Sequence, residues 1–410
     1  MLNLIRPDAD LAAAPYLKSR RDFLQAVTAT AATVALPSAW ARATPQFGTA
    51  PVPIGIIDVA GNLALTQKIF DSYASTHTNR VSRFSFTRAP APELAGKLRA
   101  MQAANRVELH IVLTGLDGIA AGIEQGVWQD LSPYHAQIGA PSALYDGGAA
   151  AIQSQAGGSG MLVAYSQQGP VLEYIPSRLA KPPKTLDELL AWTRANPKKF
   201  FYARPANSGP GRTFVMALPY MLGDKDPMDP VKGWDKTWAY LKELNKNVEY
   251  YPSGTTPTMR ELAQGSRDLI ASTMGWDIYP RVQGIVPKEA AVVAFDKPIF
   301  VADGQFAAIP KGLSEDRLAV ALDVLKFMLQ PTQQAMVYAD GYLYPGPARK
   351  GITLAQAPAE SQKVLGEFGR LPFYEPLLAS TPVKAPLEPK SLIAMFRAWD
   401  EQIGGQKVKS

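Results

Sequence analysis

The chain has 410 residues, a formal net charge of +6 and no cysteine. This length exceeds one ordinary domain, and a hydrophobic content of 47% is enough for two cores. The lack of cysteine excludes disulfides, thiolate metal sites and cysteine nucleophiles. Residues 1–43 carry five of the 42 basic and three of the 36 acidic side chains, so the rest of the chain has a charge of about +4. Because this charge is mild and no long run of like charges occurs, we expect no nucleic-acid partner.

Residues 1–43 are expected to be an export signal. Arg20 and Arg21 precede an apolar stretch that is rich in Ala and Thr and too short to span a membrane, and small residues follow it. The order predicts cleavage near Ala41 to Ala43 and resembles the twin-arginine signature, which is read as an address. We therefore expect a periplasmic protein that meets the twin-arginine translocase during export. An amphipathic surface helix is the alternative, but it leaves the low charge of this stretch unexplained.

The following segment alternates predicted strands with predicted helices. The predicted strands are residues 54–59, 81–87 and 107–115. Each is followed by a segment with helical apolar spacing, such as Leu65 and Ile69 after the first strand. This alternation implies a mainly parallel sheet, whose ligands lie at the carboxyl ends of the strands. Those ends are the loops 58–62 and 114–117.

A second lobe is predicted from the change of pattern that begins at residue 161, where an extended segment without helical period runs to residue 174. Thr185 and Glu188 then form a predicted capping box that opens a helix. A Gly/Pro-rich loop follows at 206–211, with a helix after Arg212. The remaining predicted elements are an aromatic helix at 234–241, strands at 247–252, 268–276, 291–295 and 305–310, and a helix with Leu318, Leu322, Leu325 and Leu329 on one face.

Four segments carry a resemblance to a known family, by their order and spacing behind an export signal. They are residues 110–131, 181–192, 262–277 and 322–345. The chain resembles the extracellular solute-binding proteins of ATP-binding cassette (ABC) importers, in the branch that includes the spermidine, putrescine and ferric-iron binders. The resemblance implies an α/β fold of two lobes, with mainly parallel sheets flanked by helices and a ligand cleft that closes by hinge motion.

The resemblance also implies a division of the chain and a set of partners. The expected segments are a signal peptide at 1–43, the first part of lobe 1 at 44–163, lobe 2 at 164–290, a return to lobe 1 at 291–345, and C-terminal helices at 346–410. We expect a monomer that binds a small-molecule solute and delivers it to an inner-membrane ABC permease.

In the first lobe, the strand-end loops supply four candidate ligand-binding residues, Asp58, Asn62, Thr114 and Asp117. Family position places these loops at one wall of the cleft. Their backbone N–H groups precede helices and can donate to an oxygen-bearing ligand. Ordinary helix capping by Asn62 or Asp117 is the alternative.

In the second lobe, Ser208 and Arg212 belong to the Gly-rich loop and the helix after it, with Arg204 nearby. Glycines let the backbone approach a ligand, and an arginine fork suits a carboxylate or a phosphate. The spacing is not that of a nucleotide P-loop. A plain turn is the alternative to an anion site.

The first candidates of the second lobe are Trp276 and Asp277, with Tyr279 and Tyr342 as further walls of the site. The pair matches the strand end where amine-binding relatives place an aromatic and an acidic group. A ring face with a counter-charge suits an ammonium ligand. Core packing of Trp276 and a surface cap at Asp277 are the alternatives, and Arg281 offers a group for an anion instead.

These residues favour a polyamine-like amine as the solute, with a small anion such as a phosphonate, phosphate ester or carboxylate as the alternative. The three histidines are scattered, so we expect no metal site. No G-x-S-x-G motif indicates a hydrolase, and no G-x-G-x-x-G follows the first strand. We therefore expect a binding protein without cofactor and without catalysis. A secreted enzyme or a ligand sensor on the same fold is the alternative.

Overall fold

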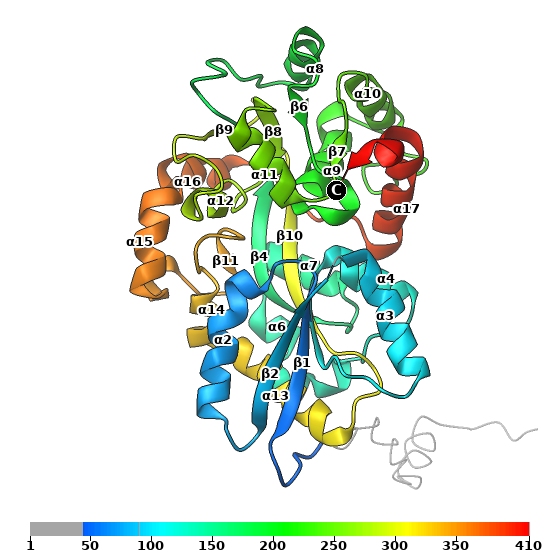
Figure 1. Cartoon of the computed structure of the whole chain (residues 1–410), viewed down its shortest axis with the longest axis vertical. Coiled ribbons are helices and arrows are strands. Elements are labelled where there is room, and N and C mark those ends of the chain that lie inside the picture. Colours follow the sequence, from blue (N-terminus) through cyan, green and yellow to red (C-terminus); the bar gives the residue numbers. More distant parts are fainter. Residues whose placement is uncertain (1–43, 90, 410) are drawn as a thin grey trace, which may run out of the picture. The chain divides into compact units, whose positions relative to one another are not determined.

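Two β-sheets of seven and four strands, with a separate two-stranded sheet, organise the part of the chain that a computed structural model describes, residues 44–89 and 91–409. The expected export signal at 1–43 lies outside these residues. The larger sheet belongs to one lobe and the smaller sheet to the other (Figure 1). The two-lobed α/β fold expected from the sequence is confirmed.

The large sheet joins strands from distant parts of the chain. Its strands are β1 (Val52–Asp58), β2 (Val81–Arg88), β3 (Ile111–Gly115), β4 (Met161–Gly169), β10 (Phe300–Ala308), β11 (Gly346–Pro347) and β12 (Val383–Lys384). Their order is β11-β4-β10-β3-β1-β2, and β12 pairs with β10. The strands β2, β1 and β3 are parallel, whereas β10 is antiparallel to both β3 and β4. The sheet is therefore mixed and not mainly parallel, because β4 leaves the first lobe and its neighbour β10 returns to it.

The residues of β1 show why a buried strand forms here. Ile54, Ile56 and Ile57 are fully buried, and a continuous apolar run of this kind is typical of a strand covered on both faces. The crossovers from β1 to β2 and from β2 to β3 run in opposite directions along the sheet. Right-handed connections therefore place α2 (Leu63–Thr76) and α3 (Ala91–Ala103) on opposite faces.

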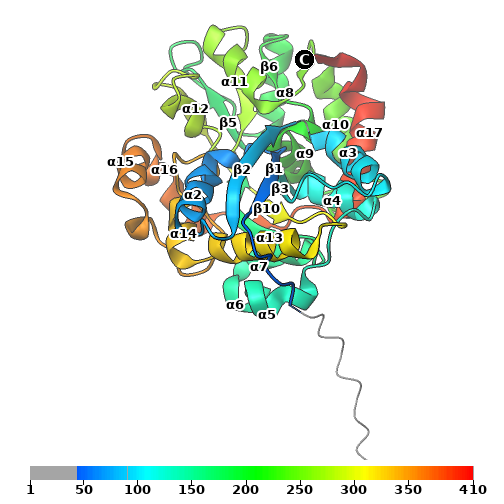
Figure 2. The same ribbon diagram turned by 60° about the horizontal axis from the view of Figure 1, so that its bottom comes forward.

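Further helices cover the large sheet. They are α4 (Leu116–Glu124), α5 (His135–Ile138), α6 (Pro141–Leu144), α7 (Gly147–Gln155), α13 (Glu315–Met328) and α14 (Pro331–Met336), with a 3₁₀ turn at Ser132–Tyr134. Figure 2 shows α2 beside α13 and α14, against which it packs, whereas α4 and α7 pack against β10. On α13 the predicted apolar face is confirmed, since Leu322 and Leu325 are fully buried.

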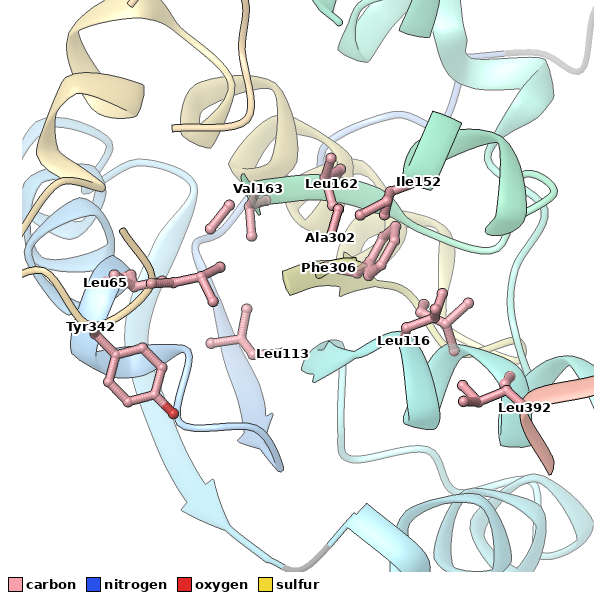
Figure 3. Close-up of a cluster of buried hydrophobic side chains, with 14 of the residues drawn as sticks. Leu65, Leu113, Leu116, Ile152, Leu162, Val163, Ala302, Phe306, Tyr342 and Leu392 are labelled. Carbon is pink, nitrogen blue, oxygen red and sulfur yellow. The ribbon is translucent and has the colours of Figure 1, made fainter. Parts of the chain in front are cut away.

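The core of this lobe joins side chains that are far apart in the sequence (Figure 3). Phe306 of β10 lies beside Leu162 of β4 and Ile152 of α7, and all three are fully buried. Leu392, from the C-terminal helix α17 (Pro389–Trp399), lies next to α4. The end of the chain therefore contributes to the core of the first lobe.

Two adjacent strands connect the lobes. The small sheet of the second lobe has the order β6-β8-β5-β9. Its strands are β5 (Val171–Tyr174), β6 (Phe200–Phe201), β8 (Leu269–Ser272) and β9 (Ala291–Val293). The chain passes from β4 directly into β5, and after β9 it returns along β10, which pairs with β4. Paired crossing strands of this kind permit hinge rotation of one lobe against the other.

The helices of the second lobe include one that begins earlier than the sequence predicted. They are α8 (Leu186–Ala195), α9 (Gly209–Leu222), α10 (Asp235–Asn245), α11 (Thr255–Gln264) and α12 (Tyr279–Val282), with a 3₁₀ turn at Pro205–Asn207. The N–H of Gly211 donates to Ser208 Oγ at 3.2 Å, so Ser208 is the N-cap of α9. Arg212 consequently lies in the first turn of the helix and not before it.

The predicted capping box at Thr185 is half formed. The N–H of Glu188 donates to Thr185 Oγ1 at 3.1 Å, as expected for the N-cap of α8. The Glu188 carboxylate accepts from the N–H of Lys184 at 2.7 Å and not from that of Thr185. The helix starts where predicted, with the return contact shifted by one residue.

The C-terminal segment adds strands to the large sheet and to the separate two-stranded sheet. Its elements are α15 (Ala359–Phe368), α16 (Leu371–Ser380), α17, β13 (Val408–Lys409), 3₁₀ turns at Leu354–Gln356 and Gly405–Lys407, and a π-helical turn at Asp400–Gly404. Within it, β12 pairs with β10, whereas β13 pairs with β7 (Tyr251–Pro252). Of the strand predicted at 247–252, only these two residues have a strand partner. Among the described residues, no helix is both long and apolar enough to cross a membrane.

Candidate functional site

A cavity of about 550 Å³ lies where the crossing strands leave the large sheet. Its walls come from α4 and the strand-end loops of the first lobe, from α9 and α11 of the second, and from β4 and β10 between them. The polar side chains that line it include Asp117, Gln168, Ser208, Arg212, Asp303 and Gln305. The cavity is therefore a cleft between the lobes, lined by polar, charged and apolar residues.

Three charged side chains, which we call the cleft ion group, line this cavity: Asp117, Arg212 and Asp303. Arg212 Nη2 lies 2.5 Å from Asp303 Oδ2, and Arg212 Nη1 lies 3.6 Å from Asp117 Oδ1. Asp117 belongs to α4, Arg212 to α9 and Asp303 to the crossing strand β10. The group thus joins both lobes, and its two carboxylates against one guanidinium leave a formal charge of −1.

The carboxylate of Asp117 is the member of this group that is best placed to gain a cationic neighbour. Burial raises its pKa, an effect that Arg212 opposes and Asp303 reinforces. A cation nearby would stabilise the ionised form. A Cβ on Gly115 would lie only 2.7 Å from Asp117 Oδ1, and one on Gly209 would lie 3.3 Å from Asp303 Oδ2. The two glycines therefore leave these carboxylates open on the side where a side chain would cover them.

An aromatic wall bounds the cavity near the first strand-end loop. The rings of Trp276 and Tyr342 lie 5.2 Å apart between centroids. The Tyr342 hydroxyl donates to the carbonyl of Ala60 at 2.8 Å, and burial raises the pKa of this hydroxyl, which keeps it neutral. Gly61 has a φ of +77°, and a Cβ there would lie 2.2 Å from Tyr342 Oη. Only glycine permits this close approach, so the loop is shaped to receive the ring.

Amide side chains from the crossing strands complete the polar lining. Gln168 is at the end of β4 and Gln305 is on β10. Both are almost fully buried, and among the described residues neither side-chain oxygen has a hydrogen-bond partner. Gln168 has a φ of +57°, which is unusual for a residue other than glycine and is typically retained at functional positions. Both amides therefore have hydrogen-bonding capacity that the protein itself does not use.

The structure brings together about half of the residues predicted for the site. Those lining the cavity are Asp117, Ser208, Arg212, Trp276 and Tyr342. Tyr279 lines a neighbouring cavity of about 230 Å³. The Ser208 hydroxyl, besides capping α9, lies 2.7 Å from the hydroxyl of Thr255, a further lining residue.

Three predicted residues of the first lobe lie behind the cavity wall. The Asp58 carboxylate accepts hydrogen bonds from three backbone N–H groups within residues 60–63, at 2.9 to 3.0 Å. It holds the loop in place, while residues 59–61 line the cavity. Asn62 and Thr114 are fully buried and do not line either cavity.

Asp277 lies in a second charged group, away from both cavities. Asp277 Oδ2 is 2.9 Å from Arg370 Nε and 3.7 Å from Arg281 Nη2, and Glu173 is a further buried carboxylate near them. We call Glu173, Asp277, Arg281 and Arg370 the sealed ion group. Trp276 and Asp277 are consecutive in the turn after β8, yet only the first side chain reaches the cleft.

Arg204 is also paired away from the cleft. Its Nε lies 2.9 Å from Asp400 Oδ1, and its Nη2 lies 2.5 Å from Asp400 Oδ2. This two-point contact ties the loop before α9 to the C-terminal segment. Of the three arginines considered for an anion, Arg204, Arg212 and Arg281, only Arg212 lines the cavity, since Arg281 is paired with Asp277.

Gln168, Asp303 and Gln305 were not among the residues predicted for the site. The sequence does contain a pattern that indicates two of them, because Asp303 and Gln305 stand at alternate positions of a strand that is otherwise apolar and fully buried. Alternate residues share one face of a strand, so two polar side chains at this spacing indicate a polar face. Among the described residues, no group of three or more His, Asp and Glu side chains is arranged to hold a metal ion.

Solved structures of transport proteins share this fold. An ABC transporter from Clostridium perfringens ATCC 13124 matches with a TM-score of 0.61 at 14% identity, covering 87% of this chain and 100% of that one. A periplasmic thiamin binding protein matches with a TM-score of 0.59 at 16% identity, covering 86% and 97%. The binding protein AgtB from A. tumefaciens R10, in complex with agropinic acid, gives 0.57 at 16%, covering 86% and 96%. At these identities the likeness establishes the fold alone.

The comparison with protein-family models places the chain in a family. The comparison with curated protein sequences found no match. Residues 68–364 match the family described as bacterial extracellular solute-binding protein. Such proteins bind small-molecule solutes and deliver them to ABC permeases. Because the match spans well over half of the sequence, the chain belongs to the bacterial extracellular solute-binding proteins.

Proposed function

We propose that this protein captures a small polar organic solute that carries an ammonium group and delivers it to an ABC importer. The observation that carries this proposal is the cleft ion group, in which Asp117 and Asp303 oppose a single guanidinium, that of Arg212. The aromatic wall of Trp276 and Tyr342 lines the same cavity. Carboxylates and ring faces both attract an ammonium group. Polyamine-like amines are therefore the first class of solute to test.

In this proposal Asp117 provides the counter-charge that the sequence analysis assigned to Asp277. Asp277 already has two arginines as partners and is fully buried, so it has no access to a solute in the cleft. Among the described residues, Asp117 has one ion-pair contact, at 3.6 Å with Arg212, which is itself held more closely by Asp303. An ammonium group beside Asp117 would therefore add a contact without breaking the closest ion pair.

A small anion is the second candidate. The Arg212 Nε has no hydrogen-bond partner among the described residues, and the N-termini of α9 and α11 adjoin the cavity at Ser208 and Thr255. Helix N-termini favour negative charge. Against this candidate, Arg212 is already neutralised by Asp303 at 2.5 Å.

A thermal-shift screen of the purified protein separates the two candidates. Putrescine, spermidine and simple monoamines form one set, and phosphate esters and dicarboxylates form the other. A solute that binds only the folded state at a hundred times its Kd adds about 2.7 kcal/mol of stability. We expect stabilisation by members of the amine set, whereas stabilisation by anions alone would refute the amine proposal. The bound amine should be recovered chemically unchanged, because turnover would mean that the protein is an enzyme.

Transport and export are tested in the cell. Deletion of the gene should abolish high-affinity uptake of the solute if the protein serves an importer, and should leave uptake intact if it serves a sensor. We propose that the protein acts as a monomer. We also propose export by the twin-arginine route, which Arg20 and Arg21 of the expected signal support. Replacing both by lysine should leave the protein in the cytoplasm, and unimpaired export of this variant would refute the route.

A further inference from the structure

A second cavity of about 230 Å³ opens beside the cleft. The two cavities share four lining residues: Gly61, Thr256, Trp276 and Tyr342. The aromatic wall of the cleft is therefore also a wall of this side cavity, and a solute lying along that wall can enter both. A cavity needs about 10–15 Å³ of this kind of volume to hold one water molecule, so the side cavity is large enough for a short arm of a solute.

The walls of the side cavity differ from those of the cleft. Ala64, Met259, Pro280 and Ile285 supply apolar surface. The ring of Tyr279 meets that of Tyr342 edge to face, with 5.2 Å between centroids. Apolar and aromatic surface with few polar groups is typical of a subsite that holds a hydrocarbon arm.

One charged side chain, Arg88, lines this cavity. It ends β2, is exposed, and takes part in none of the ion pairs found among the described residues. Asp58 is its register partner on β1, but both Asp58 oxygens accept hydrogen bonds from backbone N–H groups of the loop. The guanidinium therefore remains available to an anionic group that enters along the aromatic wall.

We propose that the side cavity is a subsite for an anionic end of the solute, a carboxylate carried on a slender apolar arm and held by Arg88. This inference rests on the proposed function, because the cleft ion group supplies the site for the ammonium end. The solute would then be dipolar, with its cationic end near Asp117 and its anionic end at Arg88. A simple polyamine would fill only one of the two cavities with a matching charge.

The test uses pairs of probes of equal length with and without a carboxylate: butylamine against 4-aminobutyrate, hexylamine against 6-aminohexanoate, and octylamine against 8-aminooctanoate. Affinities are measured by isothermal titration calorimetry on the wild-type protein, on Arg88→Gln and on Arg83→Gln. Arg83 is a matched control, because it is also exposed on β2 but lines neither cavity. At the best-fitting length we expect the carboxylate to improve wild-type affinity about tenfold, as one charge-assisted contact allows. Arg88→Gln should abolish this gain and Arg83→Gln should retain it.

The outcomes distinguish the subsite from the proposed function. If the alkylamines bind and no carboxylate gives a gain at any length, the subsite is refuted and the amine proposal stands. The same holds if Arg88→Gln keeps the full gain. If the alkylamines do not bind but the amino acids bind in an Arg88-dependent way, an ammonium group alone does not suffice for binding, so a simple polyamine is refuted as the solute and the subsite stands. If no probe binds, both are refuted.

Discussion

The cleft ion group and the sealed ion group have similar chemistry and opposite accessibility. The first, Asp117, Arg212 and Asp303, lines a cavity of about 550 Å³. The second, built on Asp277 with Glu173 and two arginines, lines neither cavity and lies between the small sheet and the start of α16. A buried cluster of charged side chains is therefore not by itself a binding site. It can bind a solute only where the cluster lines a cavity that the solute can enter.

The difference in access assigns the two groups different roles. Arg370 donates to Asp277 and to the carbonyl of Ala290, and Arg281 donates to the carbonyls of Asp277 and Phe368. These contacts join the second lobe to the C-terminal helices. In the cleft, by contrast, the one ion pair of Asp117 among the described residues is the 3.6 Å contact with Arg212. We expect the sealed ion group to control stability and the cleft ion group to control affinity.

The largest effect is expected from Asp277→Ala. This change leaves two arginines in a buried site without their shared carboxylate, and removing one partner of a buried ion pair typically costs about 3–5 kcal/mol. Urea-induced unfolding followed by circular dichroism measures the loss. The matched control is Asp117→Asn, which should cost no more than about 1 kcal/mol because Arg212 keeps Asp303. Equal losses in the two variants would contradict the assignment.

The next effect concerns Glu173, the fully buried carboxylate of the sealed ion group. Burial, reinforced by the charge of Asp277, raises its pKa from 4.5 to about 8. Between these two values the folded state binds more protons than the unfolded state, so the free energy of unfolding falls as the pH rises through this window. Glu173→Gln removes the titration. The free energy of unfolding of the variant, relative to that of the wild type, should therefore rise by up to about 1.4 kcal/mol per pH unit between about pH 5 and pH 8.

The control for this titration is Glu289→Gln, since Glu289 is exposed. Unfolding in urea is measured for all three proteins across the same pH range. The curve of the control should run parallel to that of the wild type. A Glu173→Gln curve that also runs parallel to the wild type would mean that Glu173 does not titrate in this window.

In the cleft, Asp117→Asn should weaken amine binding about 10- to 100-fold, the range expected when one charged contact is lost. Calorimetry with the best amine of the screen measures the loss. Asp71→Asn is the control, because Asp71 is exposed on α2 and lines neither cavity. An Asp117→Asn variant that binds as tightly as the wild type would refute the role of Asp117 as the counter-charge.

Much of the fold could be predicted from the sequence. Strands and helices are recognised where apolar periodicity is strong, as in β1 and α13, because burial imposes the spacing. Strand direction was predicted less well. The mixed order of the large sheet depends on β10 returning beside β4, a pairing of residues more than a hundred positions apart that no local pattern records.

The site was predicted in part, for a reason that Trp276 and Asp277 illustrate. The two residues are adjacent and together suit an amine, yet the first lines the cleft and the second belongs to the sealed ion group. The turn after β8 directs the two side chains to different sides. The Asp277 carboxylate is also held by Arg370, which is 93 residues further along the chain than Asp277. Asp303, in contrast, was detectable by its alternation with Gln305 on an apolar strand.

The smallest effect expected is the pH dependence of amine affinity, and it tests both groups at once. Burial raises the pKa of Asp117, while an alkylammonium stays charged well above neutral pH. The cation needs the ionised carboxylate, so affinity should fall as the pH drops through the pKa of Asp117, by no more in total than the loss expected for Asp117→Asn. Calorimetry between about pH 7 and pH 4 should show this fall for the wild type and a nearly flat profile for Asp117→Asn. Because Glu173 lines neither cavity, Glu173→Gln should follow the wild-type profile. A flat profile for Glu173→Gln would mean that the two ion groups are coupled. Their assignment to separate roles would then be wrong.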